Sequence, residues 1–311
     1  MTKKENVLGI AAALAANCIF GFSFIFSKSA LKYAHPLLIL AVRFTAAFLA
    51  LNVLLAFKVF KISFKGKKIT KLLLMSIAQP LLYFMFELYG LKLTSSALSG
   101  IIIALVPVGV AVFSGIFLGE KPNAVQIACS VLSLLGVAAV SFLSNDGSKN
   151  HTVGIILLAG AVITSCVFNL LSRDCSSEFS PFEKTYFMFS VAAVGFNIIA
   201  VAVLGQGYFT GIVRAFSNIE FICSIFYLST LSSVFAFFLY NYSTSKITAV
   251  CSSSFSNIIT VISVLAGVFI LKEKFSLLQC LLCIPILLGV FGVNAFSLHD
   301  SKNRADLRVK H

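Results

Sequence analysis

Charge is scarce in this sequence of 311 residues, of which only 11% are Asp, Glu, Lys or Arg. Soluble globular domains contain about a quarter of such residues. Tryptophan is absent, and 11 acidic residues stand against 24 Lys and Arg. Because 59% of the residues are hydrophobic, the composition excludes an ordinary soluble domain and indicates an integral membrane protein.

The net charge of +13 raises the question of a nucleic-acid partner. Such binding requires a basic face on a soluble fold, whereas the basic residues here lie between long apolar runs. The positive-inside rule of membrane proteins explains their positions better. We therefore expect the lipid bilayer as a partner and no nucleic acid.

Enzyme motifs are missing too. The sequence contains no GxGxxG, Walker loop or HExxH, and its four histidines are expected in loops or in the tail. The CxxC at Cys280 and Cys283 has no second pair or histidine nearby, so packing is its favoured role. We expect no enzymatic activity, no metal and no cofactor.

Long apolar runs dominate what is present. The run from Val7 to Phe26 has about 20 residues, more than a typical signal-peptide core and enough to span a bilayer of ~30 Å. We therefore expect a retained first helix and an all-α integral membrane protein with ten transmembrane helices. The expected spans are 7–27, 37–57, 72–91, 96–118, 124–143, 153–171, 182–204, 221–241, 247–271 and 276–297.

The distribution of basic residues predicts the topology. Six lysines lie between Lys58 and Lys71, which places this loop in the cytoplasm. With both termini cytoplasmic, the inner side holds 16 Lys and Arg and the outer side seven. We expect a multi-pass protein of the bacterial cytoplasmic membrane, although an odd helix count would move the C-terminus outside.

The two halves of the sequence are weakly similar. A shift of 153 positions places 96–137 over 249–290, and it matches an LxEK motif at 118–121 with another at 271–274. The same shift matches Gln126 with Gln279 and LLGV with LLGV, and a shift of 145 aligns Gly9 with Gly154 and Pro36 with Pro181. Internal repeats of this kind are typical of secondary transporters.

Because each half has five expected helices, the second half must enter the membrane in the opposite sense. We expect two inverted five-helix repeats, at 1–147 and 148–300, and a basic cytoplasmic tail at 301–311. Duplication in a membrane protein that does not transport is the alternative.

The LxEK helix ends, the PLLxxxxR pattern from Pro36 to Arg43 and the segment TSSALSGIIIALVPVGVAVFSGIFLGE resemble the EamA-like branch of the drug/metabolite transporter superfamily. The resemblance covers nearly the whole chain. It implies a ten-helix carrier with cytoplasmic termini, often an exporter of amino acids or related metabolites. The halves differ, since Pro107 corresponds to Thr260 and Arg43 to Met188.

Charges inside membrane spans are costly and often functional. Arg43 and Glu87 are the charges placed well inside the expected spans, at similar depth, and we predict that they pair directly or through water. Such a pair has a structural or a functional interpretation. The alternative is that the two groups lie apart, with Arg43 reaching toward the outer headgroups. Gln79 and Tyr83 share a helix face with Glu87 through the spacing i, i+4, i+8, and we expect this face to contact the substrate.

Neutral polar residues complete the predicted substrate site, which comprises Asn17, Gln79, Tyr83, Glu87, Ser229, Ser233, Ser253 and Asn257. Helix packing is the alternative role of each serine. There are 32 Phe and 8 Tyr, but the sequence does not show which rings converge, so no aromatic cage for an amine is predicted.

We therefore expect a secondary transporter that moves a small polar or zwitterionic metabolite by alternating access, most often outward. A proton or a solute counter-gradient is a possible energy source, and the sequence leaves the oligomeric state open. An importer of a vitamin, amine or nucleoside, and a non-transporting receptor or assembly factor, are the alternatives.

Overall fold

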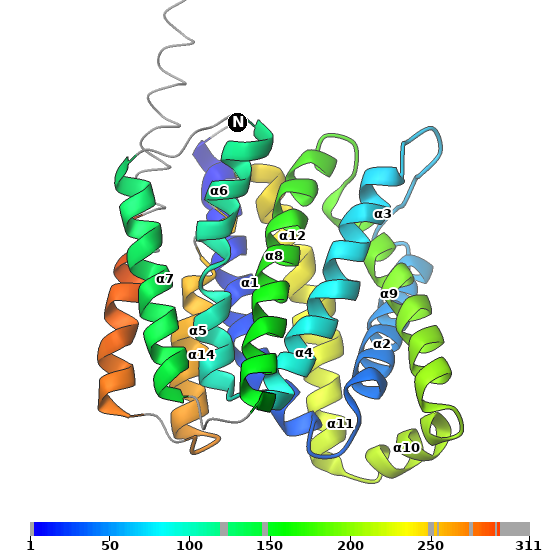
Figure 1. Cartoon of the computed structure of the whole chain (residues 1–311). Helices are drawn as coiled ribbons and strands as arrows, with labels where there is room; N and C mark the ends of the chain where they lie inside the picture. The colour runs from blue at the N-terminus through cyan, green and yellow to red at the C-terminus, as the bar shows by residue number, and fades with distance from the viewer. Residues whose placement is uncertain are drawn as a thin grey trace, which may run out of the picture.

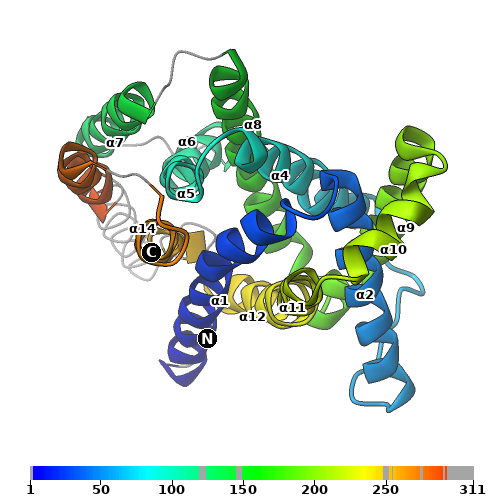
Figure 2. The ribbon, with the colours of Figure 1, turned by 90° about the horizontal axis from the view of Figure 1, so that it is seen from below.

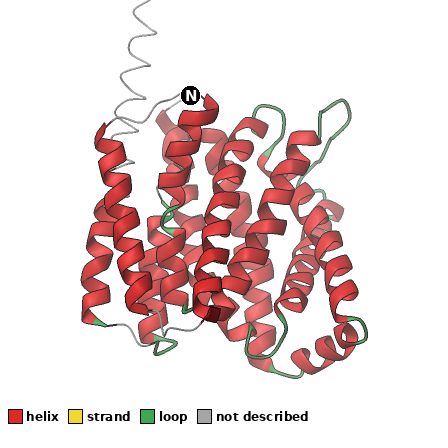
Figure 3. Ribbon diagram, viewed as in Figure 1, coloured by secondary structure: helices red, strands yellow, loops and turns green. Residues whose placement is uncertain are grey.

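The computed structural model describes residues 3–118, 124–144, 149–247, 252–253, 255–273, 276–289 and 291–292. Across these ranges the chain forms helices and short connections, with no strand (Figures 1 and 3). The chain is therefore an all-α protein, as expected from its composition. The first-repeat motif residues Glu120 and Lys121, and the basic tail at 301–311, lie outside the described residues.

Most helices run along one common direction (Figure 1). Their bounds are α1 Lys3–Ala30, α2 Pro36–Ala56, α3 Thr70–Ser76, the π-helix η1 Ile77–Leu82, α4 Tyr83–Leu93, α5 Ser96–Ile103, α6 Val106–Leu118, α7 Ala124–Ser144, α8 Lys149–Cys175, α9 Pro181–Leu204, α10 Gly207–Phe216, α11 Ile219–Phe226, the π-helix η2 Tyr227–Phe235, α12 Ala236–Lys246 and α14 Asn257–Phe269. A last helix spans Leu277–Gly289.

Every expected span overlaps a helical segment. Seven helices in the described part of the chain are long and apolar enough to cross a membrane, which makes this a multi-pass membrane protein. Three shorter apolar helices are Ile127–Val140, Asn257–Phe269 and Leu277–Gly289. The count of ten crossings stays a prediction.

Several spans are not continuous α-helices. The third contains η1, with Pro80 inside it, and proline removes a backbone N–H from the helical ladder. The fourth is broken between α5 and α6 at Ala104 and Leu105. Helix α5 ends at Ile103, four residues before Pro107, and this is the residue whose carbonyl a proline ring would crowd.

Helix α10 was not expected from the sequence. It lies across the end of the bundle, below α9 and beside the lower end of α11 (Figure 1). Tyr208 and Ala215 are buried, whereas Phe209 and Val213 are exposed. An apolar face on a short helix at the end of a membrane bundle is typical of a helix lying in the membrane interface.

The internal repeat is visible in the helix boundaries. The π-helices η1 and η2 end at Leu82 and Phe235, which are 153 positions apart, and each is followed by an α-helix of 11 residues. In Figure 1 the chain descends from α3 to α4 and ascends from α11 to α12. These segments of the two halves therefore have opposite directions, as the inverted repeat requires; the repeat boundary at 147/148 stays a prediction.

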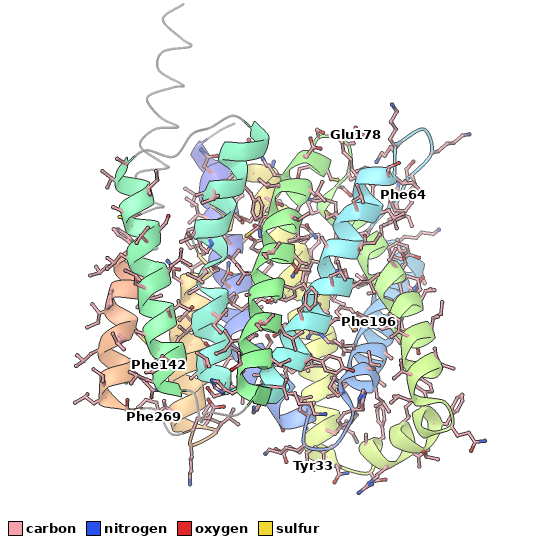
Figure 4. The ribbon with its side chains drawn as sticks, viewed as in Figure 1. Tyr33, Phe64, Phe142, Glu178, Phe196 and Phe269 are labelled. Atoms are coloured by element: carbon pink, nitrogen blue, oxygen red, sulfur yellow. The ribbon has the colours of Figure 1, made fainter. Side chains whose placement is uncertain are left out.

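The two halves interlock. Helix α1 packs on α12, α4 packs on α8 and α2 packs on α9, and Figure 2 shows α1 running between elements of the second half. Phenylalanines fill the centre and also cover the outside: Phe196 is buried, whereas Phe142 and Phe269 point away from the bundle (Figure 4). An apolar exterior of this kind suits contact with lipid tails.

The second LxEK motif links two elements that are distant in sequence. The Glu273 carboxylate accepts hydrogen bonds from the backbone N–H groups of Ser96, at 2.8 Å, and Ala97, at 3.1 Å. These N–H groups belong to the first turn of α5, where the helix itself supplies no acceptor. The motif therefore joins the end of α14 to the start of α5 in the other half.

Candidate functional site

A cavity of about 50 Å³ lies between α1, α4, α8 and α12, and both halves contribute to it. Its volume holds about four water molecules at ~10–15 Å³ each, so a metabolite requires the surrounding helices to move apart. The lining residues are Asn17, Phe20, Ser23, Phe24, Gln79, Tyr83, Phe84, Glu87, Ile103, Val106, Ser165, Phe168, Asn169, Phe237, Tyr240, Ser256 and Ile259.

Four of the sequence-predicted site residues meet in this cavity: Asn17, Gln79, Tyr83 and Glu87. Gln79 has extended backbone angles within η1, with φ −148° and ψ 122°, so a regular helix is not the cause of this alignment. All four side chains are buried in the bundle. Their contact with a substrate stays a prediction.

The other four predicted residues do not line the cavity. Ser229 donates weakly to its own helix at the Phe226 carbonyl, 3.4 Å away, and Ser233 accepts a hydrogen bond from Arg43. Ser253 is fully buried, and Asn257 is half-buried near the start of α14.

Arg43 is held by neutral side chains rather than by a direct ion pair. Its Nε donates to Ser233 Oγ at 2.9 Å and its Nη2 donates to Ser232 Oγ at 3.1 Å. The guanidinium carbon lies 4.3 Å from the centre of the Phe84 ring, a cation–π contact. Its charge also acts on Glu87, but within the described chain the two groups form no direct salt bridge, and pairing through water stays a prediction.

Sequence reasoning missed several polar groups of the cavity. Tyr240 donates to Asn169 Oδ1 at 2.5 Å, and Asn169 Nδ2 donates to the Ser165 carbonyl at 2.8 Å. Tyr240 stands 153 positions after Glu87, so the repeat alignment itself could have identified it. Asn169 was visible as an amide in an apolar run.

Three buried oxygens without hydrogen-bond partners belong to residues that line the cavity, whereas others in the described chain, such as Ser27 Oγ and Asn257 Oδ1, belong to residues outside its lining. Within the described part of the chain, Glu87 Oε2 and Gln79 Oε1 are buried and have no hydrogen-bond partner. Ser256 also lines the cavity, and its Oγ is likewise buried without a hydrogen-bond partner. Buried polar groups left unpaired cost free energy, so these atoms mark a place built to receive another molecule.

Two helix breaks border the cavity: the break at Ala104 and Leu105, and the turn at Phe255 and Ser256 that precedes α14. Ile103 and Val106 flank the break between α5 and α6, and Ser256 and Ile259 lie at the start of α14. Interrupted helices in corresponding positions of two inverted halves are typical of the substrate site of secondary transporters. The cavity is therefore the candidate substrate site of this chain.

Comparison with known proteins agrees with this interpretation. A model of the EamA-like transporter family matches residues 7–142 and again residues 152–295. The two matches cover most of the chain, one in each half.

Two of three curated bacterial relatives carry transporter names. The chain is 33% identical to the uncharacterized transporter YcxC of Bacillus subtilis (strain 168) over 312 residues, covering all of both proteins. It is 26% identical to the uncharacterized transporter YetK of the same organism, over 93% of this chain and 87% of the relative. Protein PagO of Salmonella typhimurium is 26% identical over 67% of each chain.

A solved crystal structure has the same fold. It superposes with a TM-score of 0.70 and covers 96% of this chain and 99% of its own length, at 16% sequence identity. At this identity the likeness concerns the fold alone.

Proposed function

Because this chain belongs to the EamA-like transporter family, we propose that it is a secondary carrier that moves a small polar or zwitterionic metabolite by alternating access. One observation carries the proposal: a buried chamber with unpartnered acceptor atoms lies between two inverted halves, at breaks in their helices. We propose that net transport is outward and that the substrates are amino acids or related compounds.

In this mechanism the two halves rock about the cavity and open it to one side at a time. Asn17, Gln79, Tyr83 and Glu87 hold the substrate. Ser253 and Asn257 come into contact with it when the helices around the second break separate. The interlocked packing of α1 on α12 and α4 on α8 couples the movement of one half to that of the other.

The orientation follows from the basic residues. The loop from Phe57 to Ile69 lies at one end of the bundle, at the upper right of Figure 1, and Tyr33 lies at the opposite end (Figure 4). We propose that the end with this lysine-rich loop faces the cytoplasm, together with both termini. The residues near Tyr33, with α10, then face the outside.

Transport by purified protein tests the proposal. The protein is reconstituted into liposomes loaded with one unlabelled candidate metabolite, and accumulation of the same labelled metabolite is measured by counterflow. We expect transient accumulation for at least one amino acid, amine or nucleobase, and loss of it in Glu87→Gln. Saturable binding without any flux would favour a receptor or assembly factor; net movement inward under physiological gradients would favour an importer.

A further inference from the structure

The cavity lining favours a ligand that is positively charged and donates hydrogen bonds. Of the residues that line it, all of them described by the structure, Glu87 is the only Asp, Glu, Lys, Arg or His. Its Oε2 atom is buried and unpartnered. A carboxylate in such a place costs free energy unless a cation or a hydrogen-bond donor reaches it.

The amide groups of the cavity also favour a ligand that donates hydrogen bonds. Asn17 Nδ2 donates to the Ala13 carbonyl at 2.7 Å, and Asn169 Nδ2 donates to the Ser165 carbonyl at 2.8 Å. These two amides therefore direct donor hydrogens to their own helices. Gln79 Oε1 is an unpartnered acceptor, so it too requires a donor from a bound molecule.

Arg43, the cation whose charge acts on Glu87, does not line the cavity. Arg43 uses its Nε and Nη2 on Ser233 and Ser232, and its flat face lies against Phe84. Phe84 lines the cavity, whereas Arg43 does not. A substrate carboxylate would therefore meet the ring of Phe84 and the charge of Glu87 rather than the guanidinium.

Aromatic rings supply the rest of the wall. They come from α1, α4, α8 and α12, and they are Phe20, Phe24, Tyr83, Phe84, Phe168, Phe237 and Tyr240. Several touch one another, as in the edge-to-face pair of Phe20 and Phe237 at 5.0 Å between ring centres. Aromatic faces attract ammonium groups and pack against apolar bodies.

We propose that the substrate is an organic ammonium ion with an apolar or aromatic body, and that the site selects it over a zwitterionic amino acid of the same size. The ammonium donates to Glu87 Oε2 and Gln79 Oε1, and the body lies among the rings. This inference rests on the proposed carrier function. It narrows the proposed substrates, amino acids or related compounds, to amines that lack the carboxylate of an amino acid.

Three ligands with a common phenyl ring test the charge type on the unmodified protein. They are phenethylammonium, phenylalanine and 3-phenylpropanoate, which bring a cation, a zwitterion and an anion. Binding to purified protein is measured by calorimetry at neutral pH. We expect phenethylammonium to bind at least about tenfold more tightly than phenylalanine, and 3-phenylpropanoate not to bind. Phenylalanine binding as tightly as the amine, or no binding of the amine, would overturn the inference.

Variants assign the selectivity to the cavity. Glu87→Gln should weaken phenethylammonium binding by about tenfold or more, because a hydrogen bond to a charged partner is lost. The matched control is Glu178→Gln, the same change at an exposed acid on the end of the bundle, labelled in Figure 4, and it should leave binding unchanged. Unchanged binding in Glu87→Gln would also overturn the inference.

Counterflow separates this inference from the carrier proposal. If phenethylammonium binds as expected but no solute accumulates in liposomes, the ligand class stands and the carrier function fails. If another solute shows counterflow while the amine neither binds nor competes, the carrier function stands and the ligand class fails.

Discussion

Lys28 and Arg173 make the same contact at opposite ends of the molecule. Lys28 Nζ donates to the Leu91 carbonyl at 2.8 Å, and Arg173 Nη1 donates to the Thr244 carbonyl at 2.8 Å. Lys28 and Arg173 are 145 positions apart, and Leu91 and Thr244 are 153 apart, the two offsets that align the repeats. Each half thus places a cation at the C-terminal end of α4 or α12, where it also interacts favourably with the helix dipole.

Lys28→Met should destabilise the protein by about 1–3 kcal/mol, because the ammonium also donates to the Thr94 carbonyl and both carbonyls lose a charged donor. Thermal unfolding in detergent measures the effect, and Lys28→Arg should retain most of the stability. Arg173→Met should have a smaller effect, since one such bond is lost. A Lys28→Met protein as stable as the wild type would contradict the capping role.

Gly100 allows α5 to touch α14. A Cβ atom at this position would lie 1.7 Å from Ser263 Oγ, and the Gly100 carbonyl accepts a hydrogen bond from Thr260 at 2.9 Å. Gly100→Ala should therefore cost about 1–3 kcal/mol through overpacking, measured by thermal unfolding. Gly207→Ala is the control, because a Cβ there meets no atom within 4 Å.

The double variant Gly100→Ala with Ser263→Gly should recover part of this loss, because the side chain that clashes is removed. Neighbouring residues of this kind show non-additive effects. Additive losses in the double variant would show that the contact of α5 with α14 does not set the stability.

Removing the hydroxyls around Arg43 should be more harmful than removing one elsewhere on η2. Ser232→Ala with Ser233→Ala leaves a buried guanidinium without its two acceptors, and we expect a loss of at least about 1.5 kcal/mol. Ser229→Ala, whose hydroxyl donates only to its own helix at 3.4 Å, should change little. If the double variant and Ser229→Ala lower the unfolding temperature equally, the hydroxyls of Ser232 and Ser233 do not specifically stabilise Arg43.

Glu273→Ala should loosen the start of α5, since the N–H groups of Ser96 and Ala97 lose their carboxylate acceptor. We expect a loss of about 1–3 kcal/mol and faster amide hydrogen exchange in the first turn of α5. Glu273→Gln should be intermediate because its amide keeps one acceptor oxygen. Exchange rates that do not change would contradict the link between the motif and α5.

Hydropathy was sufficient to find the helical segments, because a membrane span has to be apolar over most of its length. It could not show η1, η2 or the break before Pro107, since these depend on where the ladder of backbone hydrogen bonds is interrupted. Helix α10 was missed because it is too short to span and its apolar face is divided by polar residues.

The sequence predicted some polar residues of the cavity but not its aromatic wall. Asn17, Gln79 and Glu87 are conspicuous as polar groups in apolar runs, so the sequence identifies them. The aromatic wall was not predictable, because a phenylalanine that faces lipid and one that faces the cavity have the same local pattern. Ser233 was assigned to the substrate because the sequence does not show that Arg43 reaches it.

Glu87 and Tyr240 stand at the same position of the two repeats, and only Glu87 has a carboxyl group. In the proposed carrier, the cavity would therefore compensate one positive charge at a time, whether that charge is an ammonium ion or a proton. Exchange of one for the other would be one-to-one and electroneutral. Such a carrier would respond to a pH difference across the membrane and be indifferent to the membrane potential.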